Sequence, residues 1–143
     1  MGVQINFAPV VDINTNPRNP IIGFRSFGED KFNVASKALN YLKGMHYYGI
    51  MGAAKHFPGH GDTETDSHLT LPSINFSKER INEVELYPFK ELINNNLDGI
   101  MTAHLNIPNL DKTKISTLSK KVITNLLIED LNFKGLVITD ALD

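Results

Sequence analysis

The stretch KHFPGHGDTETDSH, residues 55–68, decides how the rest of the chain is expected to fold. It holds three histidines, one lysine and three carboxylates, and its two glycines and one proline exclude a regular helix or strand along it. The run before it, GIMGAA at residues 49–54, is apolar and rich in small residues, which is typical of a buried strand. The sequence therefore predicts a strand that ends in Lys55 and His56, followed by a long polar loop. Ionisable groups on a loop held by a rigid scaffold are typical of catalytic sites.

The composition is that of one ordinary globular domain. The chain has 143 residues, of which 41% are hydrophobic, and its net charge of -2 comes without a basic tract. This balance argues against nucleic acid or an anionic membrane as the main partner. There is no cysteine, so disulfides and cysteine-ligated zinc are excluded. No apolar run approaches the roughly 18 residues of a membrane span, and the first residues lack the features of a signal peptide, which leaves the compartment open.

Hydrophobic patterning alternates between strands and helices along the chain. Strands are expected at residues 5–13, 50–55, 98–104 and 135–140. Helices are expected between them, at 31–48 after an Asp30 cap, from a Ser77 cap to 86, at 88–93 with Pro88 in the first turn, and from a Ser119 cap onward. This order predicts a parallel sheet with helical crossovers. The expected fold class is α/β, as part of a TIM-like (β/α)8 barrel with about four parallel strands and three helical crossovers.

Every expected strand ends in an ionisable side chain. These strand-end residues are Asp12, Lys55 with His56, His104, and Asp140. In a (β/α)8 barrel the active site lies at the carboxyl ends of the strands. The pattern therefore predicts that these side chains share one face of the molecule.

Several readings stay open from the residues alone. Asp66 and His68 are two residues apart, so in an extended loop the carboxylate could fix the histidine tautomer for proton transfer. The alternative is a turn in which Asp66 accepts from backbone amides and His68 faces solvent. Asp140 could be a nucleophile, a metal ligand or a helix N-cap. Arg25 and Lys55 would suit hydroxyl, carboxylate or phosphate groups of a ligand, or surface ion pairs. The histidine spacing matches no common zinc pattern, so no metal or cofactor is predicted.

Four blocks of the sequence together carry a resemblance to a known family. They are NFAPVVDI at 6–13, RSFG at 25–28, KHFPGHG at 55–61 followed by DSH at 66–68, and TDAL at 139–142. In this order they resemble the signature of glycoside hydrolase family 3, in its β-N-acetylglucosaminidase (β-hexosaminidase) branch. The resemblance covers essentially the whole chain, and its long histidine motif is the most specific part.

The resemblance implies a TIM-like catalytic barrel and a role for six residues. Asp140 would be the nucleophile, His68 the general acid/base and Asp66 the partner of His68. Three further residues would bind hydroxyls of the sugar: Arg25, Lys55 and His56. Glycosidases usually use two carboxylates, whereas this branch has histidine as the second group. An unperturbed pKa of about 6.5 suits histidine to both giving and taking a proton near neutral pH.

The activity implied is that of a retaining exo-β-N-acetylglucosaminidase, releasing terminal β-linked GlcNAc from muropeptides or chitin-type oligosaccharides. Another family 3 activity, such as that of a β-glucosidase, is the first alternative, and the Asp66-Ser67-His68 sequence argues against it. A sugar-binding module without catalysis is the second, and the presence of both Asp140 and His68 argues against that.

Measured against the family, residues 1–143 are expected to be a partial catalytic barrel, truncated at both ends. The first strands of the barrel and its last strand would be missing. About four strands cannot close a barrel, so two sheet edges and an apolar inner face would meet water. Alone, the chain is therefore expected to be inactive and to aggregate or dimerise.

Overall fold

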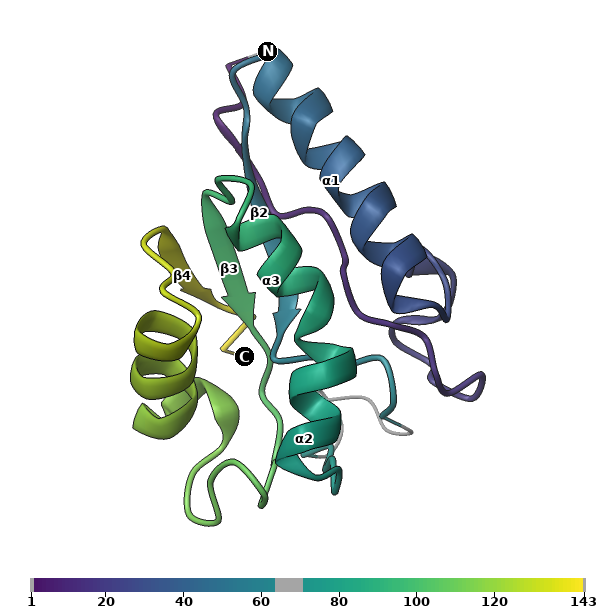
Figure 1. Ribbon diagram of the computed structural model, residues 1–143, viewed down its shortest axis with the longest axis vertical. Coiled ribbons are helices and arrows are strands. Elements are labelled where there is room, and N and C mark those ends of the chain that lie inside the picture. The colour runs from purple at the N-terminus through teal and green to yellow at the C-terminus, as the bar shows by residue number, and fades with distance from the viewer. Residues whose placement is uncertain (1, 64–70, 143) are drawn as a thin grey trace.

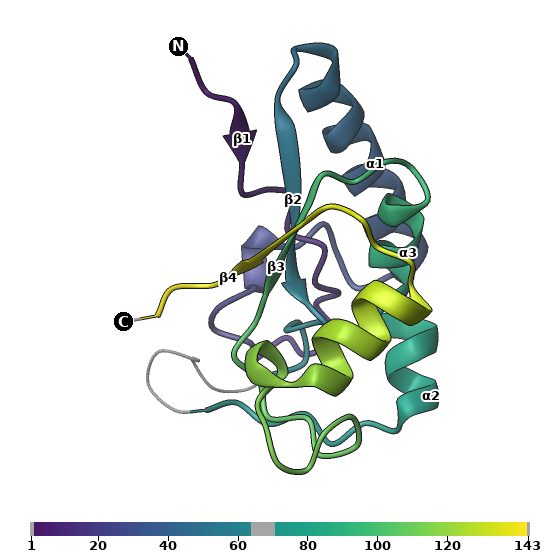
Figure 2. The ribbon, with the colours of Figure 1, turned by 90° about the vertical axis from the view of Figure 1, so that its left-hand side faces the viewer.

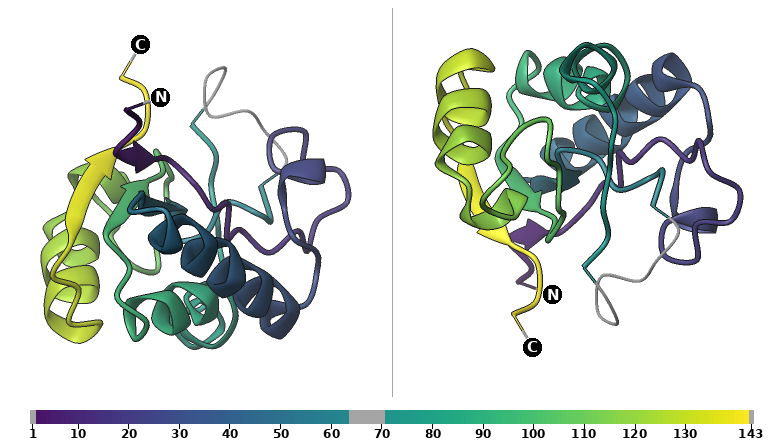
Figure 3. Two further views of the ribbon diagram at one scale, coloured as in Figure 1. Left: turned by 90° about the horizontal axis from the view of Figure 1, so that it is seen from above. Right: turned by 90° about the horizontal axis from the view of Figure 1, so that it is seen from below.

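The computed structural model describes residues 2–63 and 71–142. Its sheet has four parallel strands in the order β1 (Ile5–Asn6), β2 (Met51–Phe57), β3 (Gly99–Thr102) and β4 (Leu136–Thr139). Helices α1 (Lys31–Tyr47), α3 (Tyr87–Ile93) and η4 (Lys121–Asp130) form the crossovers (Figure 1). They lie along one side of the curved sheet, while the segment after β4 extends away on the other side (Figures 2 and 3). The predicted α/β class, with four parallel strands and three helical crossovers, is confirmed.

Helix α1 packs on β2 because of features at both of its ends. Asp30 caps it as predicted, with its carboxylate accepting from the backbone N–H of Asn33 at 2.8 Å. At the other end Gly49 has a φ of 70°, which lets the chain turn back into β2. The helix lies close to the strand because Gly52 has no side chain; a Cβ there would stand 2.7 Å from Cδ1 of Leu42.

The second crossover is broken where the sequence predicted. Short helix α2 (Lys78–Arg80), capped by Ser77, continues into the π-helical segment η2 (Ile81–Glu85). Helix α3 then begins with Pro88 in its first turn, where no backbone N–H is needed. Its Phe89 is fully buried and packs edge-on against Phe57 of β2, with ring centroids 5.2 Å apart. The break thus directs α3 onto the middle of the sheet.

The first strand is shorter than the predicted 5–13. Regular pairing covers only Ile5 and Asn6, and a separate bridge joins Val10 to Lys55. The residues between cannot continue the ladder, since Pro9 has no N–H to donate. The chain nevertheless stays beside β2, because Val11 N–H donates to the Lys55 carbonyl at 2.8 Å. That contact places Asp12 at the end of β2.

The remaining strands agree with prediction to within a few residues. β2 extends to Phe57, two residues beyond the expected end, and β3 and β4 lie within the expected ranges. Edge strand β4 has Leu136 and Val137 exposed, whereas β3 is buried throughout. Two 3₁₀ turns, η1 (Gly23–Arg25) and η3 (Ser116–Leu118), lie in the loops after the first and third strands. Within the described residues, no helix has the length and apolar character needed to cross a membrane.

Two glycine substitutions test this packing. Gly61, in the loop after β2, lies against the backbone of Ile13, and a Cβ there would collide with the Ile13 carbonyl. Backbone cannot move aside cheaply, so Gly61→Ala should lower the free energy of unfolding by about 3 kcal/mol, as overpacking does. Gly44 is an exposed residue of α1 with open space around it, so Gly44→Ala should raise that free energy by about 0.5–1 kcal/mol. Chemical denaturation of both variants in the full-length protein measures the difference, and equal effects would contradict the described loop.

Candidate active site

Three of the predicted strand-end residues form one line of side chains. The carboxylate of Asp12 lies 2.7 Å from Nδ1 of His56, and Nε2 of His56 lies 3.8 Å from a carboxylate oxygen of Asp140. Asp12 follows the first strand, His56 lies in β2, and Asp140 directly follows β4. The parallel sheet therefore brings these side chains together although the sequence separates them widely.

Asp12 is buried, and its carboxylate accepts hydrogen bonds from His56 and His60 of the histidine motif. It takes the backbone N–H and the ring Nδ1–H of His56, and the backbone N–H of His60 at 2.7 Å. Burial by itself raises the pKa of Asp12, but the adjacent His56 ring and the hydrogen bonds from His56 and His60 outweigh it and hold the pKa below its ordinary value. Asp12 is therefore a carboxylate at neutral pH and fixes the start of the loop.

This arrangement shows that the His56 ring nitrogen facing Asp12 carries a proton. A carboxylate can only accept, so the proton on the Asp12 side belongs to Nδ1 of His56. The other ring nitrogen, Nε2, faces Asp140 and also lies 3.5 Å from Nη2 of Arg25. The ring is buried, with 5% of its side chain exposed, whereas Asp140 is 30% exposed. His56 thus joins a buried carboxylate to one that a ligand can reach.

Two cations stand beside these carboxylates. Arg25, in η1, reaches the His56 ring from the loop after the first strand. The pKa of half-buried Lys55 is lowered by burial and then by Arg25, while Asp140 and Asp12 act in the opposite direction. The strand ends therefore present a charged, donor-rich surface, in which guanidinium, ammonium and carboxylate groups alternate. Such a surface suits a ligand with several hydroxyl groups.

Asp140 itself is held by its own neighbourhood. Its backbone N–H donates to the Thr102 carbonyl at 3.1 Å, which extends the pairing of β3 and β4 by one residue. One carboxylate oxygen accepts from the N–H of Ala141 at 2.9 Å, and the other faces His56. The side chain therefore has a defined direction and one oxygen that accepts no hydrogen bond from the described residues. A carboxylate so placed can attack an electrophilic carbon or bind a cation.

Sequence reasoning assigned no role to His60, Asn19 and Thr63. His60 is buried, its backbone carbonyl accepts from Asn19 Nδ2 at 2.9 Å, and its Nδ1 lies 2.6 Å from the Thr63 hydroxyl. Burial lowers the pKa of His60, so the ring is neutral near pH 7. These three residues tie the loop after β2 to the loop after the first strand. Only the density of polar residues in the motif could have indicated His60 and Thr63, and Asn19 lies outside that motif.

The predicted site is thus divided into three groups. Arg25, Lys55, His56 and Asp140 come together as expected, with Asp12 behind them. His104 lies apart from this line and contacts Thr117 and Ala141 instead. The predicted acid/base pair, Asp66 and His68, lies outside the described residues.

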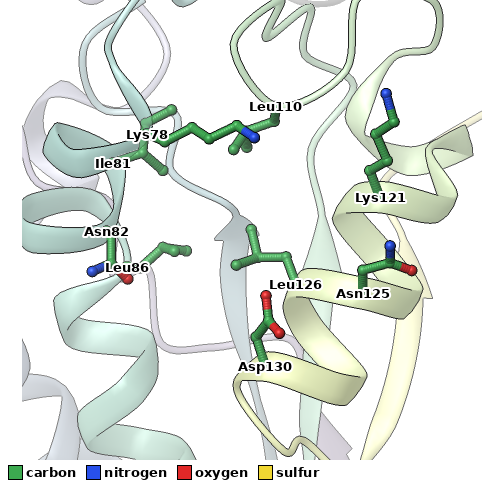
Figure 4. Close-up of a pocket in the computed structure, with 9 residues that line it drawn as sticks. All are labelled: Lys78, Ile81, Asn82, Leu86, Leu110, Lys121, Asn125, Leu126 and Asp130. Carbon is green, nitrogen blue, oxygen red and sulfur yellow. The ribbon is translucent and has the colours of Figure 1, made fainter.

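Two hollows of similar volume differ in their distance from the strand ends. One, of about 450 Å³, lies between η2 and η4 on the helix-covered side and contains no strand-end residue (Figure 4). The other, of about 520 Å³, lies in the loop after the first strand and includes Arg25. Its lining residues are Asn14, Pro17, Asn19, Pro20, Ile21, Ile22, Gly23, Phe24 and Arg25. Only the second hollow adjoins the line of side chains.

Comparison with known proteins gives one consistent result. The model of the glycosyl hydrolase family 3 N terminal domain matches residues 1–143. The chain is 42% identical over 155 aligned residues to "Beta-hexosaminidase A" of Pseudoalteromonas piscicida, covering 100% of this chain and 26% of that protein. A family 3 β-N-acetylglucosaminidase structure from Paenibacillus sp. str. FPU-7 superposes with a TM-score of 0.97 at 44% identity, over 99% of this chain and 27% of that one.

A third relative carries a bound sugar derivative. The structure of NagZ from Neisseria gonorrhoeae in complex with N-trifluoroacetyl-D-glucosamine superposes with a TM-score of 0.92 at 35% identity, covering 97% of this chain and 40% of that chain. The chain therefore spans between about a quarter and two fifths of these three proteins.

The buried Asp12 predicts a pH dependence of stability. A folded-state pKa below the unfolded value means that Asp12 stabilises the protein fully above about pH 3.9, and that this stabilisation is lost as the pH falls through the lower, folded-state value. Asp12→Asn should cost about 3 kcal/mol at pH 7, as the loss of one partner of a buried pair does, and should flatten the acid limb. Unfolding free energies measured between pH 3 and 7 check this. The exposed Asp130→Asn is the matched control, and a cost equal to that of the control would contradict the role of Asp12.

Proposed function

The chain belongs to the glycosyl hydrolase family 3 N-terminal domain family, and on that premise we propose that the full-length protein is a retaining exo-β-N-acetylglucosaminidase. The observation that carries the proposal is the line Asp12–His56–Asp140 at the strand ends, with Arg25 and Lys55 beside it. In this proposal the protein's partner is its carbohydrate substrate, a glycan with a terminal β-linked GlcNAc.

Asp140 is the proposed nucleophile. Its accessible oxygen would attack the anomeric carbon, form an ester to the sugar and break the bond to the leaving oxygen, which takes a proton from the acid/base group. Water would then attack the same carbon, give its proton to the acid/base group and release the Asp140 carboxylate. The support is geometric: one Asp140 oxygen is fixed by Ala141 N–H, while the other accepts no hydrogen bond from the described residues and lies 3.8 Å from His56 Nε2.

His68 is the proposed acid/base group and Asp66 its hydrogen-bonded partner. Both lie outside the described residues, so the support is the Asp66-Ser67-His68 sequence and its place in the loop after β2. A carboxylate on one ring nitrogen fixes the tautomer and leaves the other to exchange protons with the leaving group and with water. Asp12 supports this indirectly, because it fixes the start of the same loop.

Arg25, Lys55 and His56 are the proposed ligands of the sugar hydroxyls. The guanidinium and ammonium groups can only donate. His56 Nε2 lies 3.5 Å from Nη2 of Arg25 and 3.8 Å from a carboxylate oxygen of Asp140. Buried polar groups that match substrate hydroxyls discriminate strongly against analogues that lack them. The requirement for an N-acetyl group is supported by the names of the relatives, β-hexosaminidase and β-N-acetylglucosaminidase. Muropeptides and chitin-type oligosaccharides both offer terminal β-linked GlcNAc.

One prediction of this function concerns the nucleophile. In the full-length protein, Asp140→Ala should abolish the release of p-nitrophenol from p-nitrophenyl β-GlcNAc, because no ester can form between residue 140 and the sugar. A 5-fluoro or 2-fluoro sugar should label Asp140, with the labelled peptide identified by mass spectrometry. The rate of hydrolysis of p-nitrophenyl β-glucoside, measured in parallel, distinguishes this activity from that of a β-glucosidase. Labelling of another carboxylate would remove Asp140 from the nucleophile role.

The second concerns the acid/base group. His68→Ala should slow aryl glycosides with poor leaving groups more than those with good ones, because proton donation matters most when the leaving oxygen is basic. General acid–base help is typically worth about 10²–10⁴-fold, which sets the expected range for the poorest leaving groups. The measurement is kcat/KM across a leaving-group series. A uniform loss would show that His68 has no part in proton transfer.

A further inference from the structure

His104 holds the residue that follows Asp140. It comes two residues after β3, and its Nε2 lies 2.8 Å from the carbonyl oxygen of Ala141. Its Nδ1 lies 2.9 Å from the hydroxyl of Thr117, in η3. The ring therefore bridges the loop after β3 and the segment after β4. The proposed reaction gives His104 no role.

Ala141 is also the residue that fixes the Asp140 side chain. Its N–H donates to one Asp140 oxygen at 2.9 Å, while its carbonyl accepts from His104. On the other side, the Asp140 backbone N–H is held by the Thr102 carbonyl at 3.1 Å. The backbone is thus held on both sides of the Asp140 side chain. The Asp140 N–H is bonded to β3, and the Ala141 carbonyl is bonded to His104. Without the second contact, Ala141 could turn and take the Asp140 carboxylate with it.

The hydrogen bond from His104 does not depend on its charge. A carbonyl oxygen can only accept, so Nε2 of His104 carries a proton. When the ring is neutral, the Thr117 hydroxyl donates to Nδ1. When the ring is protonated, Nδ1–H donates to the Thr117 oxygen, and the hydroxyl donates instead to the Ala103 carbonyl at 2.8 Å. Both states leave Nε2–H on the Ala141 carbonyl, so the contact can persist through a catalytic cycle.

We propose that His104 is a positioning residue, which aims the Asp140 carboxylate by holding Ala141. The inference rests on the proposed role of Asp140 as the nucleophile. Among the described residues no hydrogen bond or ion pair joins His104 to Asp140, and in the proposed function other residues bind the sugar. Its effect should therefore fall on the step in which Asp140 attacks, and much less on sugar binding. A displacement of about 1 Å at a reacting group can cost about 100-fold in rate, so one lost contact has a measurable consequence.

Two amide substitutions separate the two contacts of the ring. The side-chain nitrogen of Gln reaches about as far as Nε2 of histidine, whereas that of Asn reaches about as far as Nδ1. His104→Gln in the full-length protein should keep the donor to Ala141, and His104→Asn should keep only the contact with Thr117. The assay is the rate of covalent labelling by a 5-fluoro GlcNAc fluoride, with the inhibition constant of free GlcNAc as the measure of binding.

His104→Asn and His104→Ala should label at least about tenfold more slowly than the parent protein, the size expected for one lost hydrogen bond. His104→Gln should stay within about threefold, and the GlcNAc inhibition constant should change less than the labelling rate in all three. Thermal melting of each variant tests the fold. If His104→Gln does not fold, Thr117→Val provides the comparison: it removes the hydroxyl and leaves Nε2 in place, so its loss should be smaller than that of His104→Asn.

Equal rates for His104→Asn and His104→Gln would overturn the proposal, as would a larger change in the GlcNAc inhibition constant than in the labelling rate. Where Thr117→Val is the comparison, a loss as large as that of His104→Asn would overturn it too. Failure of the underlying function has a different signature. In that case the parent protein itself would neither release GlcNAc nor be labelled at Asp140.

Discussion

The structure at the strand ends depends on one buried carboxylate. Asp12 cannot be left unpaired, because an isolated buried charge costs several kcal/mol. It is satisfied by the backbone N–H groups of His56 and His60 and by the His56 ring. These donors come from the end of β2 and from the loop that follows it, while Asp12 comes from the loop after the first strand. One side chain therefore joins two loops and orients an imidazole, and that imidazole faces Asp140.

The polar groups around Asp12 are ones that a hydroxyl-rich ligand can use. Buried Asp12 is followed outward by the His56 ring and then by accessible Asp140, with Arg25 and Lys55 alongside. Burial increases towards Asp12 and decreases towards Asp140, so the rigid end of the line is the one furthest from the ligand. This gradient is what a retaining glycosidase needs, since the nucleophile must be exposed to the sugar while its supports stay fixed. Family membership and local geometry are both compatible with the proposed function.

The sequence predicted the order of elements well, because that order depends on local pattern. The caps at Asp30 and Ser77 and the helix that starts at Pro88 depend on side chains within a few residues of each other. The prediction of a strand at residues 5–13 was wrong over most of that range, because an apolar run does not reveal that Pro9 interrupts the pairing. The apolar pattern favoured a strand all the same, and the chain does remain beside β2.

Long-range contacts of the site were predictable only as a group. Strand-end position indicated Asp12, His56 and Asp140, but nothing in the sequence indicated that Asp12 is the shared acceptor for His56 and His60, 44 and 48 residues away. The bridge from His104 to Ala141 was equally hidden, since it links the ends of two strands through a backbone carbonyl. Such contacts follow from the register of the sheet, which residue pattern alone does not determine.

The most direct test of the account is a crystal structure of the full-length protein after trapping with a 5-fluoro GlcNAc fluoride. The account predicts a covalent bond from an Asp140 oxygen to the anomeric carbon, with Arg25, Lys55 and His56 on the sugar hydroxyls and Asp12 still on His56 Nδ1. A sugar bound elsewhere, for example in the hollow between η2 and η4, or an ester on another carboxylate, would contradict it.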